Sequence, residues 1–169
     1  MTITVGINGF GRIGRCTLAH IAGSARNDVQ VVAINATGPI ETNAHLLKYD
    51  SVHGRFGGSV RVEGSSLDLG RGPIRVMSSY DPQTLDWGGV DVVLECTGHF
   101  RSRDKASAHL AAGAKKVLIS APGKDVDKTI VYGVNHTSLT AADTIRTRLL
   151  EALLHEALEP AEKTLEAAE

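Results

Sequence analysis

A glycine-rich turn near the N-terminus, Gly9-Phe10-Gly11-Arg12-Ile13-Gly14, constrains this sequence more than any other feature. It lies between a short apolar run (residues 3–7) and a segment with helical spacing (residues 13–21). In a strand–turn–helix unit of this kind, the first glycine permits a sharp turn and the second lets backbone N–H groups approach a pyrophosphate. The third glycine lets the helix pack closely on the strand, and the positive end of the helix faces the anion. The pattern predicts a dinucleotide-binding turn, and the alternative is a turn with a structural role only.

The composition limits the classes of protein to which the chain can belong. Of its 169 residues, 42% are apolar and 22% are charged, and the formal net charge is −1. This balance is typical of a globular domain and gives no electrostatic reason to expect nucleic acid or an acidic membrane surface as a partner. The sequence has no apolar run of membrane-spanning length and no signal-peptide pattern. Because Cys16 and Cys96 are too few and too scattered for a disulfide framework or a zinc site, we expect a reduced cytoplasmic protein without a metal.

Strand and helix patterns alternate along the first 145 residues. Apolar runs typical of buried strands occur at 3–7, 29–34, 91–96, 116–120 and 129–134. Helical spacing separates them at 13–23, 40–49 and 104–112. Between residues 59 and 76, apolar and polar residues alternate between glycines, which predicts a small antiparallel excursion. The order of the elements predicts an α/β fold with a doubly wound, mostly parallel sheet, which is a Rossmann fold.

Several longer runs carry a resemblance to a known family. They are VGINGFGRIGR at 5–15, AHLLKYDSVHGRF at 44–56, TGHF at 97–100, AGAKKV at 112–117 and VYGVN at 131–135. In this order, and over about residues 2–145, the chain resembles the NAD(P)-binding part of phosphorylating glyceraldehyde-3-phosphate dehydrogenases. Erythrose-4-phosphate dehydrogenases share much of this pattern, so the parentage stays open between the two.

The resemblance implies a role for several residues in cofactor binding. Arg12 and Ile13 should lie against the pyrophosphate, and the residue after Asn35 should read the adenosine ribose. NAD-dependent members carry an acid at that position, whereas this chain has Ala36 followed by Thr37. An acid repels a 2′-phosphate and alanine does not, so this pattern, which is similar to that of NADP-accepting members, favours NADP over NAD. The alternative is that Ala36 weakens the binding of both dinucleotides.

The other cofactor contacts implied by the resemblance lie in four loops. Ser78 and Ser79 match the loop near the adenine, and Ser120 and Ala121 match the strand end beside the nicotinamide ribose. Thr97 and Gly98 match positions whose backbone borders the cofactor, and Phe100 matches a residue that packs near the adenine. Plain core packing is the alternative for Phe100, and the match of Asn135 is weaker.

The resemblance also implies which catalytic groups this chain does not carry. The family's catalytic cysteine follows the segment that matches residues 143–145, but this sequence diverges at Arg146, and Glu151 stands at the position of the cysteine. Because the resemblance stops there, we expect no activating histidine and no substrate domain. Cys96 has no identifiable base partner, and the seven histidines show no catalytic or metal spacing. Cys16 is expected to be a small buried hydrophobe. The chain is therefore predicted to bind a dinucleotide without being an enzyme as it stands. The alternatives are part of an active aldehyde dehydrogenase complemented in trans, or an assembly scaffold that binds no cofactor.

Residues 146–169 differ in composition from the rest of the chain. They are rich in Ala, Glu and Leu, and apolar residues recur there at helical spacing, including Leu149, Leu150, Leu153 and Leu154. This predicts an engineered or grafted amphipathic helix that packs on a dinucleotide-binding domain comprising residues 1–145. The alternative is a helix that aids expression or drives oligomerisation. A homo-oligomer could form through this helix or through the face that the missing catalytic domain would cover.

Overall fold

The apolar run at the start of the chain forms the central strand of the sheet. In the computed structural model, which describes residues 2–148, β1 (Ile3–Asn8) lies between β2 (Val29–Asn35) and β8 (Val92–Glu95). Both pairings are parallel. Ile7 is fully buried, as expected for a strand that is covered on both faces.

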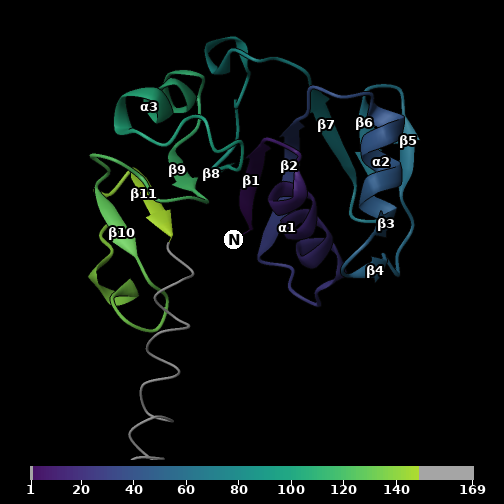
Figure 1. Cartoon of the computed structure of the whole chain (residues 1–169), viewed down its shortest axis with the longest axis horizontal. Helices are drawn as coiled ribbons and strands as arrows, with labels where there is room; N and C mark the ends of the chain where they lie inside the picture. Colours follow the sequence, from purple (N-terminus) through teal and green to yellow (C-terminus); the bar gives the residue numbers. More distant parts are fainter. Residues whose placement is uncertain (1, 149–169) are drawn as a thin grey trace, which may run out of the picture.

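One continuous sheet contains most of the strands in residues 2–148, in the order β10-β11-β9-β8-β1-β2-β7-β6-β5 (Figure 1). The other parallel strands are β7 (Pro73–Met77), β9 (Lys116–Ile119), β10 (Lys128–Ile130) and β11 (Ile145–Arg148). The antiparallel strands β5 (Arg61–Glu63) and β6 (Ser66–Asp68) extend one edge. From β1 the chain builds one side of the sheet and then returns through β8 to build the other. This reversal confirms the doubly wound arrangement and creates a switch point between β1 and β8.

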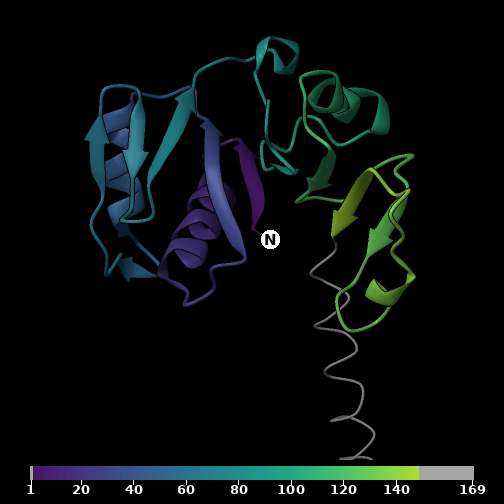
Figure 2. The ribbon, with the colours of Figure 1, turned by 180° about the vertical axis from the view of Figure 1, so that it is seen from behind.

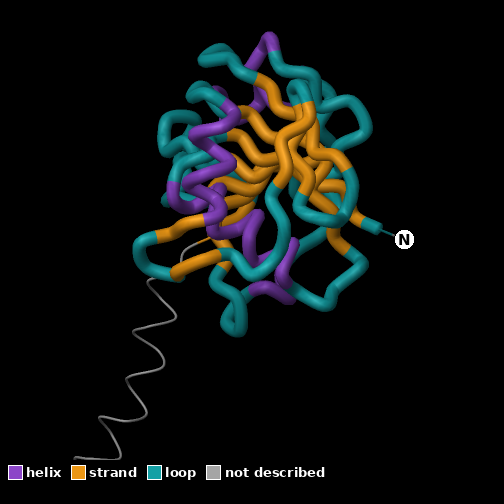
Figure 3. Tube along the Cα trace, turned by 90° about the vertical axis from the view of Figure 1, so that its right-hand side faces the viewer, coloured by secondary structure: helices purple, strands orange, loops and turns teal. Residues whose placement is uncertain are grey.

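The helices pack against the sheet and connect its strands. α1 (Arg12–Gly23) and α2 (Ile40–Lys48) cover the same face, because they lie in front of the strands in Figure 1 and behind them in Figure 2. α3 (Arg103–Ala111) packs against β9 and β11. The side view in Figure 3 shows the strands running through the middle of the molecule with helices alongside. A hairpin of β3 (Tyr49–Asp50) and β4 (Gly54–Arg55) follows α2, and short 3-10 turns occur at Pro82–Thr84 and His136–Ser138.

Buried apolar side chains form three clusters along the sheet. The first joins Leu18 of α1 to Ile7 and Ile34 of the central strands. The second surrounds Trp87, which is fully buried. The third lies under α3 and contains Ala106, Val117, Ile119 and Ile145.

Two predicted segments have different bounds in the structure. The strand expected at 129–134 ends at Ile130, because the Asn135 side chain folds the following residues into a turn. Its amide accepts the Val131 N–H at 2.8 Å and donates to the Thr129 carbonyl at 3.0 Å. Residues 146–148, assigned to the C-terminal helix, belong instead to β11 between β9 and β10. The reason is side-chain alternation, since Ile145 and Thr147 are both fully buried on one face of the strand. The helix expected from Leu149 onward lies outside the described residues.

None of the helices in residues 2–148 has the length and apolar character needed to cross a lipid bilayer.

Gly6 provides a test of how closely β1 packs against Trp87. A Cβ atom on Gly6 would lie 2.6 Å from the Trp87 ring, so either the ring or the strand would have to move. We expect Gly6→Ala to lower the free energy of unfolding by about 1–3 kcal/mol in urea denaturation. Gly57→Ala is the matched control, because no described atom lies within 4 Å of the added Cβ. Equal stability of Gly6→Ala and the unmodified chain would contradict this packing.

Candidate functional site

The glycine turn lies at the switch point of the sheet and holds α1 against β1. Gly9 has a φ of 93°, in the left-handed region that favours glycine. A Cβ on Gly9 would lie 2.8 Å from the backbone nitrogen of Thr97, so the turns after β1 and β8 are in contact. A Cβ on Gly14 would lie 2.2 Å from the carbonyl oxygen of Gly9. Glycine at both positions is therefore required for this approach.

The N-terminus of α1 is open in front of this turn. Gly11 is the N-cap residue and has no side chain with which to cap the first N–H groups of the helix. Among the described residues, no atom lies within 4 Å of the Cβ position of Gly11. Arg12 and Ile13 are exposed at the helix start, whereas Phe10 is buried in the first core cluster. The turn thus presents backbone donors to solvent at the positive end of a helix.

A row of buried polar side chains joins the strands beneath the turn. The Asn35 amide donates to Oδ1 of Asn8 at 2.7 Å, and the Asn8 amide donates to Oε2 of Glu95 at 2.6 Å. Glu95 also accepts the backbone N–H of Thr97 at 2.7 Å and the Thr97 hydroxyl group. Because Asn8, Asn35 and Glu95 are buried, these bonds fix the ends of β2, β1 and β8 relative to one another.

The same row positions the loop after β7. Asn35 exchanges two hydrogen bonds with the backbone of Ser79, at 2.8 and 2.9 Å. The backbone N–H of Ala36 donates to the carbonyl of Met77 at 2.9 Å. Ala36 is buried in the first core cluster and Thr37 is exposed, so Thr37 offers the accessible polar group at the end of β2. Ser78 and Ser79 line a neighbouring groove of about 430 Å³.

The remaining predicted residues have varied surroundings. Gly98 has a φ of 76° in the turn after β8, and the Ser120 N–H donates to the Glu95 carbonyl at 3.0 Å, just beyond β9. The carbonyl of Ala121 accepts the buried Thr147 hydroxyl, so its backbone holds β11 in place. The Phe100 ring lies edge-on to His109, with ring centroids 6.0 Å apart. Phe100 thus packs on His109, and its predicted place near the adenine stays a prediction.

Three further residues near the site were not predicted from the sequence: Asn8, Glu95 and His109. Their buried network also fixes the proton on His109. Trp87 can only donate, and its Nε1–H lies 3.1 Å from Nδ1 of His109, so Nδ1 accepts. The ring proton is thereby assigned to Nε2, which lies 2.9 Å from Oε2 of Glu95. Asn8 and Glu95 are the last residues of β1 and β8. A polar residue at the end of each apolar run was therefore the feature of the sequence that could have predicted them.

Cys96 follows directly after Glu95 and is held as a thiol. Burial raises its pKa to about 11, so the thiolate is scarce at neutral pH. Because thiolate is the nucleophilic form of cysteine, Cys96 is poorly suited to attack an aldehyde.

The doubly wound sheet, with a glycine turn at its switch point, defines a dinucleotide-binding domain of the Rossmann type. Residues 3–103 match the family described as glyceraldehyde 3-phosphate dehydrogenase, NAD binding domain. The chain belongs to this family, which confirms the resemblance seen in the sequence.

Individual relatives agree with this assignment. The chain is 61% identical over 142 residues to the glyceraldehyde-3-phosphate dehydrogenase of Xanthobacter flavus. It is 57% identical over 145 residues to that of Cereibacter sphaeroides and 60% identical over 149 residues to the chromosomal enzyme of Cupriavidus necator. These matches cover 83–86% of this chain but 42–44% of the relatives. The chain thus spans less than half the length of the curated relatives that it matches.

The Glu95 carboxylate provides a test of the polar row. Glu95→Gln keeps the size of the side chain but turns an NH₂ group toward donors on Asn8, Thr97 or His109. We expect this variant to lower the free energy of unfolding by about 1–3 kcal/mol, because buried donors lose their acceptor. Urea denaturation measures the change, and Glu63→Gln on the exposed surface of β5 should leave stability within about 0.5 kcal/mol. A Glu95→Gln protein as stable as the Glu63→Gln control would contradict the network.

Proposed function

We propose that this chain binds a nicotinamide adenine dinucleotide along the carboxyl ends of β1, β2 and β8, with the pyrophosphate at the N-terminus of α1. The observation that carries the proposal is the open helix N-terminus at Gly11, placed at the switch point by the close approach of Gly9 and Gly14. Backbone N–H groups and the positive end of a helix favour an anion there. Arg12 and Ile13 flank this position, and Arg12 adds a positive charge.

Three further groups of residues complete the proposed site. Asn35, Ala36 and Thr37 lie at the end of β2, where an adenosine ribose would be read. Ser78 and Ser79 border the adenine side, next to a groove of about 430 Å³. The nicotinamide side of the dinucleotide would be bordered by Thr97, Gly98, Ser120 and Ala121. The contact of Gly9 with Thr97 supports a single crevice shared by the two sides.

We propose further that the site accepts NADP at least as well as NAD. Discrimination between NADP and NAD rests on residue 36. An acid there would repel the 2′-phosphate of NADP, whereas alanine carries no charge. The Asn35 amide cannot take over this role, since it is already bonded to Asn8 and Ser79. Thr37 is exposed beside Ala36 and offers a hydroxyl group to the phosphate.

Substitution of Ala36 tests the dinucleotide preference. Ala36→Asp should raise the affinity for NAD, because hydrogen bonds from ribose hydroxyls to a carboxylate are worth about 1.5–3 kcal/mol each. It should lower the affinity for NADP by charge repulsion. Calorimetric titration of both dinucleotides at one salt concentration measures the two affinities, with Ala36→Ser as the uncharged control. Since Ala36 is buried, urea denaturation must first show that both variants fold.

Three results of this titration would contradict the proposal. A tenfold preference of the unmodified chain for NAD would exclude the NADP assignment. An unchanged preference in Ala36→Asp would exclude residue 36 as the position that decides it. Absence of binding by either dinucleotide would overturn the site itself and favour an assembly role.

We also propose that the 169-residue polypeptide does not oxidise aldehydes by itself. Glu151 occupies the position at which the resembling dehydrogenases have their cysteine. The raised pKa of Cys96 makes it a poor substitute. Cys16 lies on α1 and lines a groove to which none of the turn glycines contributes. Hydride transfer requires the substrate to be held covalently against the nicotinamide, and neither cysteine meets that requirement.

An activity assay tests whether the chain oxidises aldehydes by itself. The purified chain, given glyceraldehyde-3-phosphate, inorganic phosphate and NADP or NAD, should form no reduced dinucleotide. The Cys16→Ser/Cys96→Ser double variant serves as the control, because it removes both thiols. Aldehyde-dependent reduction that copurifies with the chain would contradict the proposal, and its loss in the double variant would trace it to a cysteine of this chain.

A further inference from the structure

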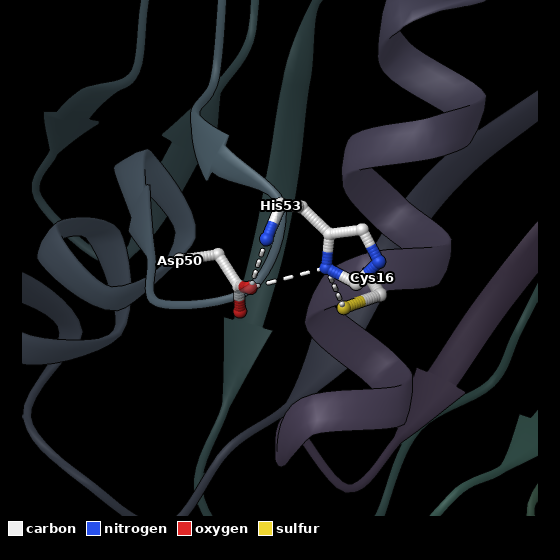
Figure 4. A group of neighbouring side chains, drawn as sticks. All are labelled: Cys16, Asp50 and His53. Carbon is white, nitrogen blue, oxygen red and sulfur yellow. Dashed lines mark hydrogen bonds and ion pairs between the residues drawn. The ribbon is translucent and has the colours of Figure 1, made fainter.

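Cys16, Asp50 and His53 form a cluster of potential metal ligands beside α1. Figure 4 shows the three side chains converging, Cys16 from α1 and the other two from the hairpin that follows α2. Sγ of Cys16 lies 3.6 Å from Nδ1 of His53, and Oδ1 of Asp50 lies 3.0 Å from the same nitrogen. One sulfur, one nitrogen and one oxygen atom all lie within 4.8 Å of one another.

The carboxylate of this cluster is charged and fixed in direction. Oδ1 of Asp50 accepts the backbone N–H groups of His53 at 2.8 Å and Val52 at 2.9 Å. The ligand is therefore oriented by the backbone of the hairpin, which reduces the cost of ordering it around a cation.

The proton arrangement does not match a nucleophilic cysteine. Nδ1 of His53 faces both Asp50 and Cys16, and the charged carboxylate requires Nδ1 to donate. A base that activates a thiol must instead direct a lone pair at the sulfur. The same nitrogen cannot do both, so the contact between Cys16 and His53 is not that of a base-activated thiol.

We propose that Cys16, Asp50 and His53 bind one Zn²⁺ ion, with a fourth coordination position facing the neighbouring groove. A tetrahedral zinc site with ordinary bond lengths needs about 3.6 Å between sulfur and nitrogen and about 3.4 Å between nitrogen and oxygen. The observed sulfur–nitrogen separation is 3.6 Å, the nitrogen–oxygen separation is 3.0 Å, and the sulfur and oxygen atoms lie within 4.8 Å of each other. Thiolate, imidazole and carboxylate are all established zinc ligands.

The charges and protons of this site balance. A thiolate and a carboxylate together neutralise the two charges of Zn²⁺. On binding, the Cys16 proton leaves to solvent and the His53 proton moves from Nδ1 to Nε2, so no other reactant is needed. The Arg12 guanidinium lies 3.8 Å from Oδ1 of Asp50 and is half-exposed, so it can turn away when the cation takes this oxygen. The fourth position faces a groove of about 1010 Å³ that Leu46 and Phe56 also line.

The sequence predicts a protein without a metal, and that prediction is the alternative to the zinc site proposed here. Cys16 is only partly buried and its thiol lies 3.6 Å from Nδ1 of His53, whereas the sequence predicts a small buried hydrophobe. Sequence spacing could not reveal the cluster, because 37 positions separate Cys16 from His53. Folding of α1 beside the hairpin brings them together.

Metal titration of the purified chain tests the proposal without any dinucleotide, so its outcome is independent of the proposed cofactor site. The buffer contains a reductant that does not bind metal, and a chromophoric chelator competes for the ion. Under these conditions we expect one equivalent of Zn²⁺ to bind per chain. Cys16→Ser and Asp50→Asn should each weaken this binding at least tenfold. The matched control is Cys96→Ser, which removes the other cysteine and should leave the affinity unchanged.

Cobalt substitution identifies the sulfur ligand directly. Co²⁺ bound to the chain should give a thiolate-to-metal charge-transfer band that Cys16→Ser abolishes and Cys96→Ser retains. Urea denaturation establishes that each variant is folded, and Asp50→Asn provides a second test if Cys16→Ser fails to fold. The proposal is overturned if no stoichiometric binding occurs, if the band survives in Cys16→Ser, or if Cys96→Ser removes it.

Discussion

The close contact between the start of α1 and the end of β1 is the constraint on which the rest of the molecule depends. A side chain on Gly14 would collide with the Gly9 carbonyl, and one on Gly9 would collide with the backbone at Thr97. Because both positions lack a Cβ, the helix packs on the central strand and the turns after β1 and β8 meet. Without this approach, the helix N-terminus could not stand at the switch point, where an open α/β sheet binds its ligands.

Hydrogen bonds between buried side chains beneath the glycine turn fix the positions of the strand ends around it. Asn8, Asn35 and Glu95 connect three neighbouring strand ends in the interior, where an unpaired polar group is costly. His109 extends the row, and the donor of Trp87 fixes its tautomer. The apolar core alone would stabilise the sheet, but these directional bonds fix which loops border the crevice and how far apart they lie.

The two cysteines show how neighbouring groups, rather than residue type, decide chemistry. Cys96 lies in an apolar surrounding that raises its pKa to about 11 and keeps it protonated. Cys16 faces an imidazole and a charged carboxylate in a groove, which is an environment suited to a cation. Asp50 belongs to this second environment and also lies near Arg12 at the start of α1. Arg12 therefore belongs to the proposed dinucleotide site and also contacts a residue of the proposed metal site.

The sequence by itself determined the fold class, the glycine turn and the central strands β1, β2, β8 and β9, because apolar periodicity and glycine spacing act over neighbouring residues. It placed residues 59–76 in an antiparallel excursion, whereas β7 pairs in parallel with β2. The strand that begins at Ile145 was not predicted, because the segment is short and its pairing with β9 joins residues distant in the sequence. The polar row through Glu95 and the cluster around Cys16 were decided by tertiary structure alone. Their members lie on different elements, and only the packing of those elements determines which polar atoms come within bonding distance.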